Sequence, residues 1–278
     1  MDERARQHAP RRESRNALAE ALMLRDGDTL RMVEEAVRHK QVMLAYQPVV
    51  QARRPDRMAF YEGLIRVLDE TGRVIPAAEF IDTIEETETG RRIDCLALEK
   101  GLLALARTPS LRLAINMSAR SIGYRPWTRT LERGLRSDPT VAERLILEIT
   151  EGSAMLVPEL VIGFMSDLQK RGIAFALDDF GAGFTALRHF KRFQFDILKI
   201  DGQFIRNIHA DPDNQVLTQA ILSIAQQFDM FTVAENVENA EDVATLTAMG
   251  VDCLQGYFFG APTVSPGWLA PRESRASA

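Results

Sequence analysis

Short apolar runs alternate with longer stretches of helical periodicity along most of the chain. The apolar runs predict eight strands, at Met43–Val49, Met58–Arg66, Leu111–Met117, Leu145–Ile149, Ile173–Leu177, Ile197–Ile200, Phe231–Ala234 and Val251–Leu254. The periodic stretches predict helices at Arg92–Ala106, Pro158–Lys170, Asn214–Gln227 and Ala240–Met249. This alternation is typical of parallel strands joined by crossover helices. Eight strands of this kind favour a closed barrel over an open sheet.

The first two predicted strands depart from this scheme. Only a short polar link, Gln51–Arg57, joins them, whereas a parallel crossover needs about a dozen residues or more. We therefore expect this pair to be antiparallel. The predicted fold class is α/β, a TIM-like (β/α)8 barrel with an antiparallel first strand and a short N-terminal helical segment before it.

The two ends of the chain differ in composition from the middle. We expect residues 1–28 to form a polar and helical extension, residues 29–268 the barrel domain and residues 269–278 a disordered tail. Helical spacing runs through Ala17–Lys40, and Asp26, Gly27 and Asp28 are expected to interrupt it. The apolar residues Leu18, Leu22 and Met23 would either pack on the barrel or bind a regulatory protein.

The composition narrows the class of protein. Apolar residues are 46%, charged residues are 26% and the net charge is −5, which is ordinary for a globular protein and argues against a DNA or RNA polymer as partner. No apolar run reaches the length of a membrane span, and no apolar leader is present. We expect a cytoplasmic protein in which Cys95 and Cys253 are buried thiols rather than metal ligands.

Polar side chains collect near the carboxyl ends of the predicted strands. They are Glu62, Asn116, Glu148, Asp178, Asp179, Lys199, Asp201, Glu235 and Gln255. In a parallel barrel these ends converge on one face, which is where barrel enzymes carry their active sites. A single acid in such a place more often caps the next helix. Several carboxylates in one bowl repel one another, however, and need protons or cations.

The residue types favour a hard divalent cation. Oxygen ligands suit Mg²⁺ or Mn²⁺, and none of the four histidines forms the HExxH pairing that indicates zinc. The adjacent Asp178 and Asp179 could serve two metals about 3.5–4 Å apart, the arrangement for in-line displacement at a phosphate. Lys199 would orient the attacking water, or would only form an ion pair that stabilises the acids.

The segment Gly181–Ala186 allows a competing interpretation. It fits the G-x-G-x-x-A pattern of dinucleotide-binding loops, and Asp201 follows at the expected interval. A nicotinamide-dependent oxidoreductase is therefore an alternative. The charges of Asp178 and Asp179, directly before the loop, would oppose a pyrophosphate there, which favours a glycine turn that lets the loop move over the site.

Nine segments in order resemble the EAL family of cyclic di-GMP phosphodiesterases. They are YQPVV (46–50), EGLIR (62–66), PAAEFI (76–81), INMSA (115–119), LEITE (147–151), LDDFGAGF (177–184), DILKID (196–201), VAENVE (233–238) and LQGYFFGAP (254–262). The resemblance covers residues 43–262. It implies a barrel with an antiparallel first strand and hydrolysis of cyclic di-GMP to linear pGpG. It also implies support by two Mg²⁺ or Mn²⁺ ions, inhibition by Ca²⁺, and a homodimer.

The resemblance also implies roles for residues at matching positions. The metal ligands would be Glu62, Asn116, Glu148, Asp178, Asp179 and Glu235; the catalytic residues Glu235, Lys199 and Glu62; the substrate-binding residues Gln47, Arg66, Asp201 and Gln255. Glu235 would be a ligand or the general base, and Lys199 would hold or activate the water. Glu151 would anchor the loop Asp179–Ala186, which in this family couples dimerisation to the site.

The chain departs from the family pattern in three places. Gly63 stands where alanine is usual, Phe184-Thr185-Ala186 where Tyr-Ser-Ser is usual, and Asn236 where glycine is usual. None of these changes removes a charged catalytic group. Asn236 is tolerable if its backbone needs a positive φ, and would lower activity if it crowds Glu235. A domain that binds cyclic di-GMP without cleaving it, and signals to a partner, is the alternative function.

Overall fold

The computed structural model describes residues 27–182 and 192–269. In this part of the chain one sheet holds β1 (Val42–Gln51), β2 (Arg54–Leu68), β3 (Val74–Pro76), β4 (Leu113–Asn116), β5 (Leu145–Thr150), β6 (Ala174–Phe180), β7 (Ile197–Ile200), β8 (Phe231–Ala234) and β9 (Cys253–Gln255). The strand order is β1-β9-β8-β7-β6-β5-β4-β2-β3, and a further pairing of β1 with β2 closes the barrel. The predicted closed α/β barrel is confirmed, with β3 as an additional strand on the outer edge of β2.

The antiparallel first strand is also confirmed. β1 runs antiparallel to both of its neighbours, β2 and β9, whereas every pair from β2–β4 round to β8–β9 is parallel. The connection is shorter than the predicted polar link, because only Ala52 and Arg53 form the turn and residues 54–57 already belong to β2. Those polar residues are exposed, so they extend the hairpin beyond the barrel.

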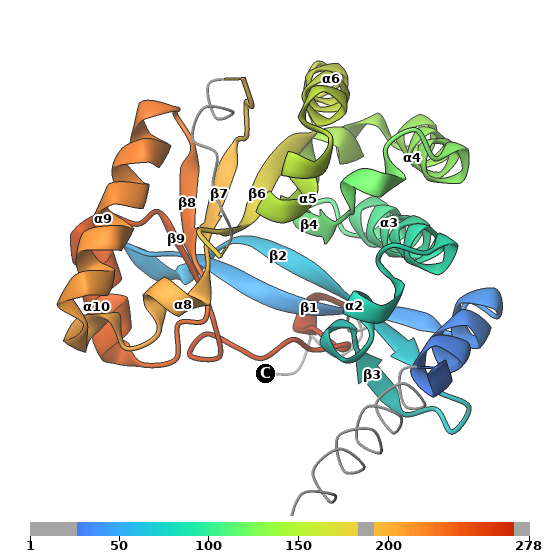
Figure 1. Cartoon of the computed structure of the whole chain (residues 1–278), viewed down its shortest axis with the longest axis horizontal. Helices are drawn as coiled ribbons and strands as arrows, with labels where there is room; N and C mark the ends of the chain where they lie inside the picture. Colours follow the sequence, from blue (N-terminus) through green and yellow to red (C-terminus); the bar gives the residue numbers. More distant parts are fainter. Residues whose placement is uncertain (1–26, 183–191, 270–278) are drawn as a thin grey trace, which may run out of the picture.

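Helices surround the barrel (Figure 1), with α9 and α10 on one side and α3, α4 and α6 on the other. Their bounds are 27–38 for the first described helix, and then α2 (Ile81–Ile84), α3 (Glu88–Arg107), α4 (Arg125–Ser137), α5 (Glu151–Leu156), α6 (Pro158–Gln169), α8 (Gly202–Ile205), α9 (Pro212–Gln227) and α10 (Ala240–Met249). Short 3-10 turns occupy Ala77–Glu79, Ala119–Ser121, Pro139–Arg144, Ile208–Ala210 and Gly267–Leu269. No helix in the described ranges is long and apolar enough to cross a membrane.

Three predicted elements have the predicted bounds: β7, β8 and α10. β3 and α4 were not predicted, although α4 carries a readable signal in Trp127, Leu131 and Leu135, which are spaced by four and buried on one face. The expected interruption of the first helix is wrong for Gly27 and Asp28, which are both helical. Leu18, Leu22 and Met23 lie outside the described residues, as do 183–191 and 270–278, so the division at residues 28 and 268 stays a prediction.

The barrel interior is built in two layers by the two-residue period of a strand. The first is an apolar cluster of buried side chains, Val49, Phe60, Ala114, Ile146, Ala176, Ile197 and Val233, with Cys253 packed against it. Residues that alternate with these along each strand, such as Leu147 on β5, point outward into the larger core beneath the helices.

The two cysteines, Cys95 and Cys253, are free but only partly buried. Burial raises the pKa of their thiols to about 12 and about 11.

Candidate active site

A polar layer lies two residues along each strand from the apolar layer. Its members are Gln47 on β1, Glu62 on β2, Asn116 on β4, Glu148 on β5, Asp178 on β6, Lys199 on β7, Gln255 on β9, and Glu235, which follows β8. On the parallel strands the polar residue comes after the apolar one, as in Ile146 and Glu148. On the antiparallel β1 the order is reversed, and Gln47 pairs directly with Glu62. The polar layer is therefore at the carboxyl end of the barrel.

Lys199 is the centre of this layer. Its side chain is 1% exposed, and Nζ lies 2.7 Å from Glu235 Oε1, 2.8 Å from Asp178 Oδ1, 3.2 Å from Glu148 Oε2 and 3.4 Å from Glu62 Oε2. Burial by itself lowers the pKa of the ammonium group, but the four carboxylates outweigh burial and raise the pKa well above 10.5. Lys199 is therefore charged at any physiological pH.

One ammonium group does not balance the surrounding carboxylates. Burial and the charge of Glu62 raise the pKa of Glu148 well above its usual value. Burial raises the pKa of Glu235 to about 8 against the opposing effect of Lys199. Burial and the neighbouring Asp178 raise the pKa of Asp179 to about 6. The site therefore has more negative than positive charge. This excess of negative charge is expected of a cation site before its ion binds.

Glu62 is the exception among these acids. Burial raises its pKa, but the charge of Lys199 and hydrogen bonds to its carboxylate lower it more. Asn116 Nδ2 donates to Glu62 Oε1 at 2.8 Å, and Gln255 Nε2 donates to Glu62 Oε2 at 2.6 Å. Gln255 Nε2 also donates to Gln47 Oε1 at 3.2 Å. Lys199 and the amides of Asn116 and Gln255 therefore hold Glu62 ionised, while the side-chain oxygen of Asn116 keeps its lone pairs for another partner.

The carboxylate geometry fits a divalent metal. Among the described residues, Glu62, Glu148 and Asp178 each offer an oxygen within 4.8 Å of the others, and so do Asp178, Asp179 and Glu235. Asp178 belongs to both groups. Glu148 Oε1 is buried and has no hydrogen-bond partner within the described ranges, so it offers a free lone pair where an unpaired oxygen is costly. Carboxylate and amide oxygens are ligands that suit Mg²⁺ or Mn²⁺.

A break in the strand brings Asp178 and Asp179 to the same site. Consecutive residues of a regular strand point to opposite faces. The pairing of β6 with β7 is irregular between Leu177 and Phe180, and Asp179 has a left-handed backbone with φ 54°. Such a bulge re-aims a side chain. The two acids lie inside β6, rather than after a strand ending at Leu177 as predicted.

The other predicted site residues lie at the rim of the layer. Arg66 is partly buried and donates to the carbonyl oxygen of Ile65 at 2.9 Å. Burial lowers the pKa of Arg66, and the charges of Glu62 and Tyr257 oppose that effect. Asp201 caps α8 by accepting from Gln203 N at 2.7 Å. The structure therefore shows a helix cap at Asp201, and its contact with substrate stays a prediction.

Glu151 lies at the base of the glycine loop. Its Oε2 accepts a hydrogen bond from Gly181 N at 3.0 Å, and its side chain is buried at the start of α5. The remaining loop residues, 183–191, lie outside the described residues, so Phe184, Thr185 and Ala186 receive no structural account. The hydrogen bond gives Glu151 a contact to the segment that follows Asp178 and Asp179.

An aromatic pair at the rim was not predicted from the sequence. Tyr257 and Phe258 are 69% and 48% exposed, and they directly follow Gln255 and Gly256. Tyr257 is close enough to Arg66 for its charge to affect the pKa of that guanidinium. The available signal was the run of aromatic residues next to a strand-end glutamine, because exposed aromatic rings beside a polar site commonly stack on flat ligands.

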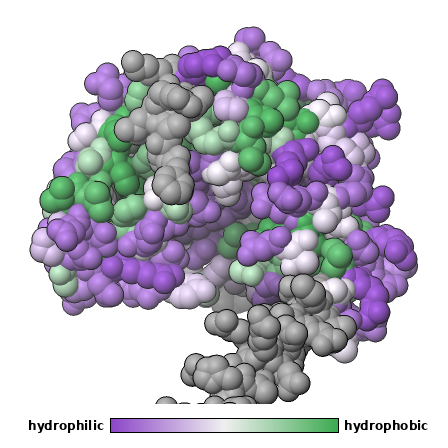
Figure 2. Space-filling view, in the orientation of Figure 1, coloured by the Kyte–Doolittle hydropathy of each residue, from purple (hydrophilic) through white to green (hydrophobic). Residues whose placement is uncertain are grey.

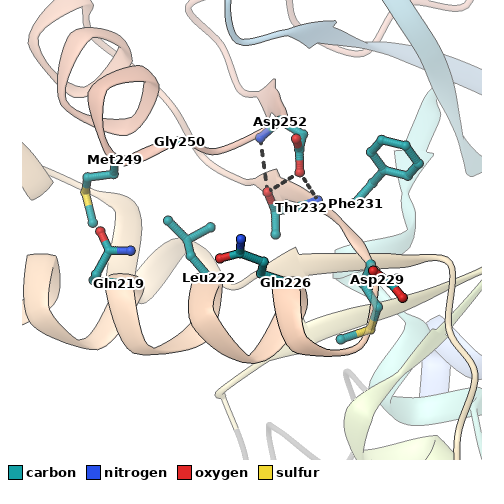
Figure 3. A pocket seen from close by; sticks show the side chains of 10 residues that line it. Gln219, Leu222, Gln226, Asp229, Phe231, Thr232, Met249, Gly250 and Asp252 are labelled. Atoms are coloured by element: carbon teal, nitrogen blue, oxygen red, sulfur yellow. Dashed lines mark hydrogen bonds between the residues drawn. The ribbon is translucent and has the colours of Figure 1, made fainter.

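Cavities lie at both ends of the barrel. One of about 450 Å³ borders the polar layer and is lined in part by Asn116, Asp179 and Glu151. At the opposite end, cavities of about 830 and 460 Å³ share Phe231, Gly250 and Asp252. Figure 3 shows the smaller of these, where the Asp252 carboxylate accepts from the amide and hydroxyl groups of Thr232. Neither of these two cavities is lined by a residue of the polar layer.

Comparison with known proteins identifies relatives of the whole barrel. Cyclic di-GMP phosphodiesterase PdeF of Escherichia coli is 30% identical over 234 residues, which are 83% of this chain and 31% of PdeF. Cyclic di-GMP phosphodiesterase PdeB of Shewanella oneidensis is 27% identical over 247 residues, which are 87% of this chain and 29% of PdeB. The chain thus spans about a third of the length of these relatives.

Solved structures share the same barrel. The PaMucR phosphodiesterase in complex with c-di-GMP superposes with a TM-score of 0.74 at 28% identity, covering 89% of this chain and 99% of that one. The FimX EAL domain of Pseudomonas aeruginosa bound to c-di-GMP superposes with a TM-score of 0.76 at 24% identity, covering 85% and 97%. The EAL domain family matches residues 30–262. This chain belongs to the EAL domain family.

Proposed function

We propose that this chain is a metal-dependent phosphodiesterase that hydrolyses cyclic di-GMP to linear pGpG. The observation that carries the proposal is the buried Lys199 among four carboxylates, with two candidate ligand groups that share Asp178. Relatives named cyclic di-GMP phosphodiesterases support the substrate class. Structural neighbours bound to c-di-GMP support the nucleotide.

The residues that would hold two Mg²⁺ or Mn²⁺ ions are Glu62, Asn116, Glu148, Asp178, Asp179 and Glu235. Bound divalent ions neutralise phosphate charge and make water more acidic. The raised pKa values of Glu148 and Glu235 mean that protons occupy part of the site until cations displace them. Calcium, which is larger and accepts looser geometry, is expected to bind without supporting turnover.

The chain's own groups would then carry the proton transfer. Glu235 accepts a proton from the attacking water, with a pKa near the working pH. Lys199, 2.7 Å from Glu235 Oε1, holds that carboxylate in place and orients the water. The water oxygen bonds to phosphorus as the bond from phosphorus to the ribose 3′ oxygen breaks. That oxygen takes a proton from a solvent water, and Glu235 then returns its own proton to solvent. One cleavage opens the ring and yields pGpG.

Other residues would bind and orient the nucleotide. Arg66 suits a phosphate oxygen because its guanidinium offers paired donors. Gln47 and Gln255 place side-chain amides beside Glu62, where they would contact the ribose phosphate. Tyr257, exposed next to Arg66, would stack on a guanine. Glu151 would steady the glycine loop through Gly181, and Asp201 would reach substrate only if its helix cap opened.

Assembly and location are further proposals that come from the family resemblance. A homodimer would have an apolar surface available on α5 and α6, where Leu156, Val157 and Leu160 are 58%, 41% and 49% exposed. Figure 2 shows hydrophobic areas near α6 and over α9, and smaller ones elsewhere, on a face that is mostly hydrophilic. Light scattering of the purified chain tests the dimer. A cytoplasmic location and a regulatory partner at the N-terminal segment stay predictions.

The test is direct hydrolysis of cyclic di-GMP. We expect the purified chain to form pGpG with Mn²⁺ or Mg²⁺, and to form none with EDTA or with Ca²⁺ alone. The chain carrying Glu235→Gln, prepared in parallel, controls for contaminating enzymes. Nucleotide binding without pGpG would overturn the enzyme proposal and favour a receptor. The full set of acids and the lysine favours catalysis, because a receptor has no need of a buried lysine beside a general base.

A further inference from the structure

The segment after β7 and the segment after β8 meet at Gly202 and Asn236. Gly202 is buried at the first position of α8. Asn236 directly follows Glu235 and has a left-handed backbone with φ 55°. A methyl group built on Gly202 would lie 2.6 Å from Asn236 Cγ and 2.7 Å from Asn236 Cβ. The side chain of Asn236 therefore occupies the space that a side chain at position 202 would need.

Rotation of the asparagine cannot relieve this overlap. A Cβ atom is fixed by the backbone, so at 2.7 Å from Asn236 Cβ a methyl group on Gly202 requires the backbone itself to shift. The positive φ of Asn236 is what aims its Cβ across the gap, and asparagine tolerates that conformation at little cost. A glycine at 236 would keep the conformation and remove the obstruction.

We infer that Asn236 requires glycine at position 202, because a larger residue there would push the two segments apart and move Glu235 away from Lys199. The pair adjoins the last contacts of β7 with β8, where Ile200 pairs with Ala234 and Glu235 N donates to Ile200 O at 3.3 Å. Any separation of residues 202 and 236 therefore moves Glu235 relative to Lys199, whose Nζ lies 2.7 Å from its carboxylate. The catalytic consequence rests on the proposed function, whereas the packing does not.

The helix α8, which begins at Gly202, also contacts the glycine loop. Gln203 Nε2 donates to Gly181 O at 3.1 Å. The ring of Phe204 lies so close to Gly181 that a methyl group there would be 2.5 Å from Phe204 Cε2. A displacement of α8 by an enlarged residue 202 thus also reaches the segment that follows Asp179. An enlarged residue 202 would therefore displace both Glu235 and the segment that follows Asp179.

The test is a double-mutant cycle on the intact chain. Gly202→Ala is expected to lower kcat for cyclic di-GMP hydrolysis by about 10- to 100-fold, because small misplacements of catalytic groups have effects of that size. The KM should change less than about threefold. Asn236→Gly alone should keep kcat within about threefold, and Gly202→Ala combined with Asn236→Gly should recover at least about tenfold of the loss. Gly27→Ala, an exposed helical glycine with open space around it, controls for the added methyl group.

Thermal unfolding of the same four variants keeps the pair testable without activity. We expect Gly202→Ala to lower the Tm, and Asn236→Gly to restore it when combined. An additive cycle, in which Asn236→Gly rescues neither kcat nor Tm, would overturn the inference. So would a Gly202→Ala variant identical to the wild type. Rescue of Tm in a chain with no hydrolytic activity would support the pair and contradict only the proposed function.

Discussion

The apolar layer and the polar layer inside the barrel are made by the same strands, but burying their side chains has opposite effects on the free energy of folding. On β5 the apolar layer has Ile146 and the polar layer has Glu148, two residues apart; on β7 the corresponding residues are Ile197 and Lys199. Burial of the apolar layer is favourable by about 25 cal/mol per Å² of apolar surface. Burial of carboxylates in the polar layer is unfavourable unless cations or donors compensate them.

This difference separates a layer that stabilises the fold from a layer with the features of a candidate site. At the amino end of the barrel, the carboxylates of Asp196 and Asp252 accept hydrogen bonds from their own chain, Asp196 from Phe175 N and Asp252 from Thr232. At the carboxyl end, burial raises the pKa values of Glu148 and Glu235, and the single Lys199, which they share with two other carboxylates, does not offset it. Surplus charge of this kind lowers stability and is typical of a binding or catalytic site.

Replacing Lys199 should have the largest effect. Lys199→Met leaves Glu62, Glu148, Asp178 and Glu235 without their common partner. We expect hydrolysis to fall by about 10³-fold or more and the metal-free protein at pH 8 to lose about 3–5 kcal/mol of unfolding free energy. Ile197→Val on the same strand is the control, with a loss of about 1 kcal/mol and an unchanged kcat. Equal effects of the two variants on kcat would contradict the distinction between the layers.

Glu235→Gln should separate activity from stability. Without the carboxylate, hydrolysis should fall by about 10²- to 10⁴-fold. The metal-free protein at pH 8 should be as stable as the wild type or more stable, because the variant removes one buried negative charge whose pKa is raised to about 8. Val233→Ala, in the apolar layer, should behave in the opposite way and lose about 2 kcal/mol with little change in kcat. Urea unfolding and nucleotide separation measure both quantities.

The pH dependence of the metal-free protein is the third prediction. The pKa of Asp179 rises from 3.8 to about 6 and that of Glu235 from 4.5 to about 8 on folding. The folded state therefore holds more protons than the unfolded state, and stability falls as pH rises through this window, by up to about 1.4 kcal/mol per pH unit for each group. Lys199, with a raised pKa, contributes no slope below pH 10.

Metal should remove this slope. Saturating Mn²⁺ replaces the protons, so urea unfolding between pH 6 and pH 8 should become nearly independent of pH, and Glu235→Gln should flatten the metal-free profile in part. A metal-free stability that rises between pH 6 and pH 8 would show that these carboxylates ionise without a penalty. That result would contradict the claim that burying the polar layer is unfavourable.

The smallest effect is expected at the amino end of the barrel. Phe231 begins β8 and is 65% exposed at the edge of the cavity in Figure 3. Phe231→Ser should change the unfolding free energy by less than about 0.5 kcal/mol and should leave kcat within about twofold. A large loss of hydrolysis would mean that this end of the barrel acts on the polar layer.

Much of the fold was predictable because its signals are local. The bounds of β7, β8 and α10 follow from apolar runs flanked by polar or helix-capping residues. β3 was missed because Val74–Pro76 is too short for a period to show. The candidate site was predicted in outline, since acids near strand ends converge in a parallel barrel. The family resemblance named the set of site residues more completely than the pattern could.

The sequence by itself determined the alternation of strands and helices, the antiparallel first pair and the placement of polar residues near the carboxyl ends of the strands. These depend on neighbours within a few residues. Tertiary structure alone decided that Lys199 meets Glu62, 137 residues away, that a bulge turns Asp178 and Asp179 to one side, and that Asn236 covers Gly202. Barrel closure and strand register create such contacts, and no local pattern encodes the distance between two strand ends.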